Sequence, residues 1–252
     1  MSAKRPCFPA ISTASLRKRV KNMWNGKKKA VTFSFDDGVI QDRRAIAILD
    51  KYGLKGTFNL NSERFDLTFK TSAGYTRSTI SASEVKELYK NHEVAVHTLT
   101  HPNLTEQTDE EIIRQVDEDR KNLEKLVGYP IRCMAYPCGG VNNDDRVAEI
   151  IRNNTPIRFS RTITSTNAFD LQDNLLRFNP TVYYRCEEDF FKLVEEFLVL
   201  KTDKPQLLYI WGHTYEMDEG GISWTNFEKI CKMLSGKEDI FYGTNSEVFF
   251  HD

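Results

Sequence analysis

The chain has 252 residues, 40% of them hydrophobic and 12% aromatic, which is enough to bury the core of one globular domain. Its net charge of −1 conceals a basic N-terminus, since residues 1–35 hold nine Lys or Arg and no acidic residue. No stretch of 18 apolar residues occurs, which excludes a membrane-spanning helix, and the first thirty residues lack the apolar core of a secretory signal.

These features predict how the chain is divided and where it works. Residues 1–28 are expected to form a basic, solvated arm rather than a nucleic-acid-binding segment, and residues 29–252 to form the folded, functional domain. A cytoplasmic location is expected, with no membrane span and no nucleic-acid partner. Nothing in the sequence indicates the oligomeric state.

Strands and helices are expected to alternate along the chain. The apolar run at 30–35 is typical of a buried strand, and the apolar spacing at 41–53 is typical of a helix closed by glycine. Capping boxes that begin at Ser81 and Thr108 predict two further helix starts. The remaining expectations are strands at 56–61, 93–98, 131–137, 157–163 and 206–211, helices at 81–89, 108–127, 146–152, 187–200 and 226–234, a polar insertion at 62–79, and a short terminal strand and helix.

This order predicts an α/β fold with a parallel sheet and helices outside it. A closed or nearly closed, distorted (β/α) barrel fits best, and an open doubly wound sheet is the alternative. Polar residues cluster where hydrophobic strands end. Because the C-terminal ends of barrel strands share one face, four separate segments are expected to meet at one site.

The first of these segments, FDDG, places Asp36 and Asp37 side by side at a strand end. Adjacent carboxylates repel each other unless a cation or a separation of roles resolves the repulsion. The alternative is an Asp cap for the helix that starts near Gln41.

The second segment, HTLTH, sets His97 and His101 four residues apart. Pro102 disfavours helical geometry at His101, so a strand end followed by a tight turn is expected. Two imidazoles and one carboxylate leave coordination positions open, which is typical of a catalytic rather than a structural zinc site. The alternative is a pair of histidines packed in the core.

The third and fourth segments are AYPCGG and YIWGHTYE. A turn fixed by Pro137 can aim the backbone N–H of Cys138 at a developing oxyanion, although Pro and Gly mark ordinary turns in most proteins. His213 stands two residues after Trp211. Trp211 can supply an apolar wall, and His213 can donate a proton near neutral pH. The alternative for His213 is a core histidine packed among aromatic rings.

With these residues assembled, the chain resembles the polysaccharide deacetylase family, also called the NodB-homology domain or carbohydrate esterase family 4. TFSFDDG is similar to its first motif, HTLTH to its second, YPCG to its third and WGH to its fifth. The resemblance covers about residues 29–215. It implies a (β/α)7-type distorted barrel and a hydrolase that removes acetyl groups, N-acetyl foremost, from a carbohydrate or polysaccharide by cleaving a linear amide.

The resemblance also implies residue roles. Asp36 would be the general base and His213 the general acid. The backbone N–H of Cys138 would share the oxyanion with a divalent metal, foremost Zn²⁺, with Co²⁺, Ni²⁺ or Mn²⁺ as alternatives. The metal ligands would be Asp37, His97 and His101, and the oxyanion and substrate-binding residues would be Tyr136, Pro137, Cys138 and Trp211.

The chain departs from the family pattern in three places. The third motif usually has an Arg two residues before its Pro, where this chain has Ala135; Trp211 stands where Leu is usual, and the Asp-Trp motif is missing. In the family that Arg supports the base Asp, and we hypothesise that Arg161, in FSRTI, replaces it, because Arg161 is the nearest basic residue expected at the same barrel mouth. Arg161→Ala should then lower turnover and leave the metal content intact.

Two other functions stay open at the level of sequence. One is a related amidohydrolase that opens a small cyclic amide or ureide, although the intact Asp37, His97 and His101 set argues against a metal-free version. The other is a carbohydrate-binding module with a decayed site, motivated by Ala135 and the missing Asp-Trp motif. The presence of all five candidate catalytic side chains favours the deacetylase.

Overall fold

The structure is a computed structural model that describes residues 23–250. The first 22 residues of the basic arm predicted at 1–28 lie outside this range, and the rest of it contains the short helix η1 (Met23–Gly26). Trp24 is buried, and its Nε1 donates a hydrogen bond of 3.0 Å to the backbone carbonyl of Val248. The two ends of the described chain therefore pack against each other.

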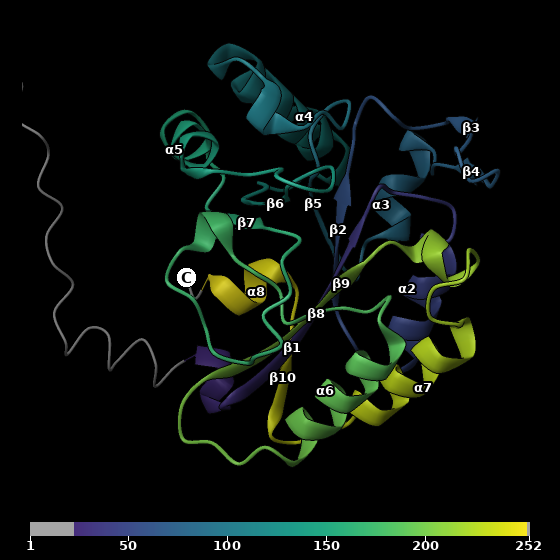
Figure 1. The fold of residues 1–252 in the computed structure, drawn as a ribbon, viewed down its shortest axis with the longest axis vertical. Helices are drawn as coiled ribbons and strands as arrows, with labels where there is room; N and C mark the ends of the chain where they lie inside the picture. The colour runs from purple at the N-terminus through teal and green to yellow at the C-terminus, as the bar shows by residue number, and fades with distance from the viewer. Residues whose placement is uncertain (1–22, 251–252) are drawn as a thin grey trace, which may run out of the picture.

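A curved sheet of eight parallel strands forms the centre of the described chain (Figure 1). The strands in chain order are β1 (Lys29–Asp36), β2 (Gly56–Leu60), β5 (Glu93–Val96), β6 (Cys133–Ala135), β7 (Phe159–Arg161), β8 (Val182–Tyr183), β9 (Gln206–Gly212) and β10 (Ile240–Tyr242). Across the sheet they follow the order β7, β6, β5, β2, β1, β9 and β8, with β10 beside β1. Parallel pairing requires a crossover between neighbours, which the helices and long loops supply.

The two edges of the sheet are joined by the segment that leads into β8. The backbone N–H of Phe178 donates to the carbonyl of Ser160 in β7 at 3.0 Å, and that of Thr181 donates to the carbonyl of Tyr209 in β9 at 2.9 Å. The sheet therefore curls into a nearly closed barrel. The predicted distorted (β/α) barrel is confirmed, and the open doubly wound alternative is wrong.

The helices cover the outside of the curved sheet. They are α2 (Asp42–Lys51), α3 (Val85–Leu88), α4 (Asp109–Val127), α5 (Asp145–Asn154), α6 (Glu187–Val199) and α7 (Trp224–Leu234), followed by the short α8 (Asn245–Phe249). Helices α2, α6 and α7 lie together on one flank, and α3, α4 and α5 on another (Figure 1). Within residues 23–250, no helix is both long enough and apolar enough to cross a membrane.

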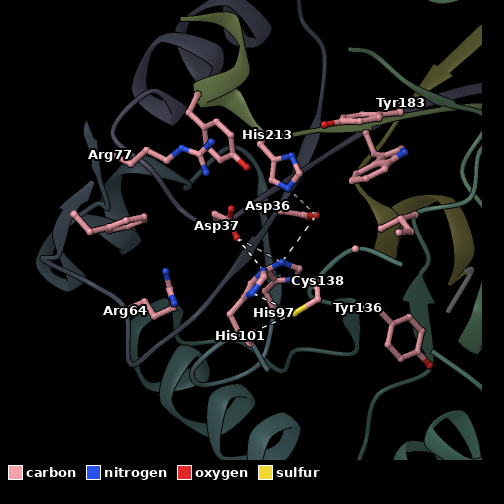
Figure 2. Close-up of a pocket in the computed structure, with 15 residues that line it drawn as sticks. Asp36, Asp37, Arg64, Arg77, His97, His101, Tyr136, Cys138, Tyr183 and His213 are labelled. Carbon is pink, nitrogen blue, oxygen red and sulfur yellow. Dashed lines mark hydrogen bonds and ion pairs between the residues drawn. The ribbon is translucent and has the colours of Figure 1, made fainter. Parts of the chain in front are cut away.

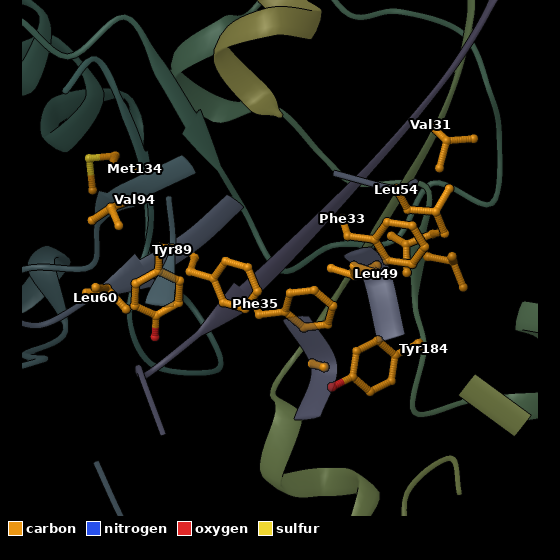
Figure 3. Packing of buried hydrophobic residues seen from close by; sticks show 14 of the residues in the cluster. Val31, Phe33, Phe35, Leu49, Leu54, Leu60, Tyr89, Val94, Met134 and Tyr184 are labelled. Atoms are coloured by element: carbon orange, nitrogen blue, oxygen red, sulfur yellow. The ribbon is translucent and has the colours of Figure 1, made fainter. Parts of the chain in front are cut away.

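Strand β1 shows how the sequence divides the core into two layers, because every one of its residues is buried. Val31, Phe33 and Phe35 belong to the large apolar cluster between the sheet and the helices (Figure 3). The alternate residues face the other way, since side chains along a strand point to opposite faces. Ala30 belongs to the second apolar cluster, and the same row ends at Asp36 at the C-terminal end of the strand.

The predicted helices and strands are present, although some of their ends differ. The structure also contains a hairpin and a short strand that were not predicted. The strands predicted at 131–137 and 157–163 shorten to the three-residue β6 and β7. The polar insertion predicted at 62–79 contains an antiparallel hairpin of β3 (Thr68–Lys70) and β4 (Thr76–Ser78), which the sequence reasoning missed together with β8. Strands of two or three residues are too short to show an alternating pattern.

The two predicted capping boxes have different outcomes. The box at Ser81 is confirmed, and it begins the short helix η2 (Ala82–Glu84), which leads into α3. At Thr108 only half of the box forms, because the Thr108 hydroxyl accepts from the N–H of Glu111 while the Glu111 carboxylate binds Arg114 instead of returning to the cap. The ion pair with Arg114 outcompetes the return bond.

Candidate active site

The C-terminal ends of β1, β5, β6 and β9 meet at one face of the barrel around a cavity of about 460 Å³ (Figure 2). All four sequence segments predicted to converge contribute to it. The predicted site residues that line the cavity are Asp36, Asp37, His97, His101, Tyr136, Cys138, Trp211 and His213. Arg161 lies behind this surface, and Pro137 is not among the lining residues.

Asp36, the last residue of β1, is buried among cationic and amide groups. Nη2 of Arg161 lies 2.5 Å from each carboxylate oxygen, and Nδ2 of Asn59 donates to Oδ1 at 2.9 Å. Nε2 of His97 and Nε2 of His213 each lie 4.0 Å from Oδ2. Burial alone would raise the pKa of Asp36, but the neighbouring guanidinium and imidazole charges outweigh it, so the pKa is lowered. Asp36 is therefore an ionised carboxylate at pH 7.

Arg161 reaches Asp36 from β7. It pairs with Ala135 in the β6–β7 register, so it projects from the strand next to the position where the third motif usually carries its Arg. The side chain is fully buried, its Nε donates to Oγ of Ser34 at 3.2 Å, and its guanidinium lies 4.4 Å from the ring centre of Trp211. The structure thus brings the Arg161 guanidinium to the Asp36 carboxylate, the pair of groups that the sequence hypothesis joined.

Asp37, His97 and His101 present ligand atoms within 4.8 Å of one another. Oδ1 of Asp37 lies 3.6 Å from Nε2 of His97 and 3.4 Å from Nε2 of His101. Ligand atoms about 2.1 Å from a tetrahedral zinc lie about 3.4 Å apart, so these three donors fit a zinc site with positions left open. Neither carboxylate of FDDG caps α2, whose N-cap is Gln41, and the helix-cap alternative is therefore wrong.

The backbone turns these side chains toward one point. Asp37, Thr98 and His101 have φ values of 80°, 71° and 67°, a region that non-glycine residues rarely occupy. Nδ1 of His97 lies 2.9 Å from the carbonyl of Ala135, which leaves its Nε2 directed at Asp37. Burial and then the charge of His97 lower the pKa of His101 to about 4, so its imidazole is neutral at pH 7.

His213 is held by a carboxylate that follows it in sequence. Nδ1 of His213 lies 3.5 Å from Oε2 of Glu216, which also accepts the backbone N–H of His213 at 3.1 Å. The hydroxyl of Tyr183 donates a short hydrogen bond to the other oxygen of Glu216. Burial alone would lower the pKa of His213, but Glu216, Asp37 and Asp36 outweigh it and raise the pKa to about 9. His213 is therefore protonated at pH 7.

The predicted apolar wall is present and is larger than expected. The ring of Trp211 stacks on Tyr183 with centroids 4.4 Å apart, and His213 lies at the edge of the pair. Tyr183 comes from the two-residue β8, which gave no signal in the sequence. Together these rings form one side of the pocket (Figure 2).

The YPCG turn lies on another side of the pocket. Sγ of Cys138 lies 3.7 Å from Nδ1 of His101, and Cys138 has a φ of 69°. Tyr136 directs its hydroxyl away from the centre of the pocket, where it donates to the carbonyl of Leu176 at 2.7 Å (Figure 2). Pro137 shapes the turn without lining the pocket.

Sequence reasoning missed further residues that line the pocket or lie directly behind it. Glu216 stands three residues after His213 within the quoted YIWGHTYE, and a carboxylate at that spacing was an available signal. Arg64, Phe69 and Arg77 come from the insertion, whose polar composition predicted only a loop. No pattern in that stretch indicates that its side chains turn back toward the strand ends.

Comparison with known proteins places the chain in a family of carbohydrate-modifying hydrolases. A model of the polysaccharide deacetylase family matches residues 24–154, so the chain belongs to this family, and the predicted resemblance and hydrolase class are confirmed. A relative is the peptidoglycan-N-acetylmuramic acid deacetylase PdaC of Bacillus subtilis (strain 168), 26% identical over 121 residues. The match takes in 47% of this chain but only 23% of that relative's length.

Two solved structures share the barrel. The Xyl-CE4 domain of a multidomain xylanase from the hindgut metagenome of Trinervitermes trinervoides is 17% identical, with a TM-score of 0.58 over 88% of this chain and 90% of that chain. A family 4 acetyl xylan esterase from Clostridium thermocellum, in complex with a cobalt ion, is 15% identical, with a TM-score of 0.54 over 87% of this chain and 90% of that chain. At these identities the likeness establishes the fold.

Proposed function

We propose that this chain is a metal-dependent hydrolase that removes acetyl groups, N-acetyl foremost, from a carbohydrate. The observation that carries the proposal is the meeting, in one pocket, of a buried carboxylate–guanidinium pair, Asp36 and Arg161, with a cluster of two imidazoles and one carboxylate. Membership of the polysaccharide deacetylase family and the cobalt complex of a structural neighbour support it. Nothing observed favours the cyclic-amide hydrolase or the decayed binding module.

The metal site of this proposal consists of Asp37, His97 and His101, whose mutual distances suit tetrahedral zinc. A divalent ion bound there supplies Lewis-acid polarisation of the acetyl carbonyl and lowers the pKa of water. The protein contributes two imidazole nitrogens and a carboxylate oxygen, which are directed at one point.

Asp36 is the general base in this proposal. Its carboxylate is ionised, and its Oδ2 faces the pocket between His97 and His213, where it accepts a proton from the attacking water. Arg161 holds both oxygens and so fixes the orientation of the carboxylate and keeps it charged inside the barrel. This is the positioning role that the sequence hypothesis gave to Arg161.

His213 is the general acid. Because Glu216 keeps its imidazole protonated, Nε2 can give a proton to the departing nitrogen of the amide at neutral pH. The backbone N–H of Cys138 is proposed to donate to the oxyanion, and Trp211 to pack against the sugar or the acetyl methyl group. Acetate and a free amino sugar are the products.

The test couples metal analysis to acetate release. Purified wild-type protein is assayed for bound divalent metal and for acetate release from a panel of acetylated sugars that includes chitin oligomers, acetylated xylan and glycan strands of peptidoglycan. We expect about one equivalent of zinc or a similar ion at this site, and acetate release that stops when the ion is chelated. Full metal occupancy without acetate release from any substrate would count against the function.

Three variants separate the proposed roles. His97→Ala should lose both metal and activity, whereas Asp36→Asn should retain the metal and lose turnover. Arg161→Ala should retain the metal and turn over slowly. Full activity of Asp36→Asn at normal metal occupancy would make the assignment of the base wrong.

A further inference from the structure

The inserted segment adds a cationic side to the active-site pocket. Arg64, Phe69 and Arg77 all lie within residues 62–79 and line the cavity. Figure 2 shows Arg64 and Arg77 on the side of the pocket opposite Tyr183. None of them belongs to the barrel strands that carry the proposed catalytic groups. The two arginines differ in whether their guanidinium groups are paired with a carboxylate, and this decides which of them can bind an anionic ligand.

Arg77 is already neutralised within the protein. Its Nη2 and Nε lie 2.6 and 2.8 Å from the two carboxylate oxygens of Glu219 in a bidentate pair. Its guanidinium also lies 3.3 Å from the ring centre of Tyr215. These contacts fasten the inserted hairpin to the loop after β9, and they leave no net charge on Arg77 for a ligand.

Arg64 has no such counterion. Across residues 23–250, no carboxylate lies within ion-pair distance of its guanidinium, and its one aromatic contact is with Phe69, 5.5 Å from the ring centre. Figure 2 shows the guanidinium directed into the pocket beside His101. Arg64 therefore presents an uncompensated positive charge to whatever occupies the pocket.

The acidic groups that line the same pocket do not compete for this charge. Asp36 is paired with Arg161, and Oδ1 of Asp37 faces the two imidazoles of the proposed metal site. A guanidinium donates through a planar fork that matches a carboxylate in a bidentate way. One uncompensated cation matches one negative charge, which favours a carboxylate monoanion over a phosphate dianion.

We propose that Arg64 is a substrate-binding residue that recognises a carboxylate substituent on the sugar, so that the chain acts on an acidic, acetylated carbohydrate. This inference rests on the proposed function and specifies its substrate class. Neutral glycans would still enter the pocket, but they would leave Arg64 without a partner. Selectivity then comes from one charge-assisted contact on the opposite side of the pocket from Tyr183.

The test uses a matched pair of ligands. One is a tetrasaccharide of N-acetylated glucosamine in which alternate rings carry a 3-O-lactyl carboxylate, and the other is its methyl ester, which is neutral but otherwise the same. Dissociation constants are measured by calorimetry, and kcat/KM is measured by acetate release. Wild-type protein, Arg64→Gln and the control Lys70→Gln are compared, since Lys70 is an exposed residue of the same hairpin that does not line the cavity.

Wild type and Lys70→Gln are expected to bind the acid about tenfold more tightly than the ester, the size of a charge-assisted hydrogen bond. In Arg64→Gln the ratio of the affinities for acid and ester should fall to about one, because the guanidinium is lost.

An unchanged affinity ratio in Arg64→Gln, or no preference for the acid in wild type, overturns the inference. Acetate released equally from both ligands would overturn it and leave the deacetylase proposal standing. An acid preference in binding that Arg64→Gln removes, without acetate release from either ligand, would uphold the carboxylate site and contradict the deacetylase proposal.

Discussion

Glu216 sets the protonation of His213, and through it the pH range of the proposed reaction. Five titratable groups face the imidazole, namely Glu216, Asp36, Asp37, Tyr183 and Tyr215. The three carboxylates raise the pKa of His213 to about 9, so the acid form is present at neutral pH and is lost as the pH rises through that value. We expect kcat/KM to fall on the alkaline side near pH 9.

Glu216→Gln removes the nearest of these carboxylates and should move the alkaline limb to lower pH by about one unit. The measurement is a profile of kcat/KM from pH 6 to pH 10.5. Glu228→Gln is the matched control, because Glu228 pairs with Lys51 on the outside of the barrel. An alkaline limb that stays in place in Glu216→Gln would show that His213 does not supply the proton.

Most of the polar side chains at the centre of the candidate site could be predicted from the sequence. Asp36, Asp37 and the two histidines of HTLTH could be found because each follows a hydrophobic strand, and parallel strands bring their C-terminal ends together. Arg161 could be found because it is the nearest basic residue on a strand expected at the same barrel mouth, and its guanidinium contacts Asp36. Arg64 could not be found, since it stands on an insertion whose course no periodic pattern determines.

At the level of elements, predictability followed strand length. The all-buried β1 and the seven-residue β9 were recognised because both are long and rich in apolar and aromatic residues. β6 and β7 were recognised as well, but their predicted ends were too long, because apolar residues continue past the last sheet hydrogen bonds. β3, β4 and β8 were missed because two or three residues contain no period to detect.

The short helix η1 makes an element-scale prediction about where the folded domain begins. Trp24 is 2% exposed, and Nε1 donates to the carbonyl of Val248, so it joins the start of the described chain to α8. Trp24→Ala should lower the free energy of unfolding by about 3–5 kcal/mol, since it removes a large buried ring and its hydrogen bond. Urea denaturation measures the difference.

Two controls separate packing from general effects of substitution near the N-terminus. Trp24→Phe keeps an aromatic ring but loses the indole N–H, and about 1 kcal/mol of the loss should remain from the unpaired carbonyl of Val248. Lys28→Ala should change stability by no more than about 0.5 kcal/mol, as is usual for a half-exposed side chain. Equal stabilities of Trp24→Ala and Lys28→Ala would place the start of the domain after η1, at the boundary of residue 29 inferred from the sequence.

Metal binding at the proposed site should stabilise the whole barrel, because the ligands of the metal come from two separate parts of the chain. Asp37 follows β1, whereas His97 and His101 follow β5, and β2 separates these strands in the sheet. The unfolded chain does not hold the three side chains together, so a metal that binds them stabilises the folded state by mass action. Zinc at a hundred times its dissociation constant should add about 2.7 kcal/mol to the free energy of unfolding.

The stabilisation is measured as the difference between urea denaturation with zinc and with a chelator, for each variant separately. His97→Ala should abolish the difference, whatever it does to the stability of the metal-free protein. His92→Ala is the matched control, since His92 is also buried but lies outside the pocket, where its Nδ1 accepts the backbone N–H of Gly56. His92→Ala should keep the full zinc increment. If the increment persisted in His97→Ala, zinc would be binding elsewhere on the fold, and the assignment of Asp37, His97 and His101 as its ligands would be wrong.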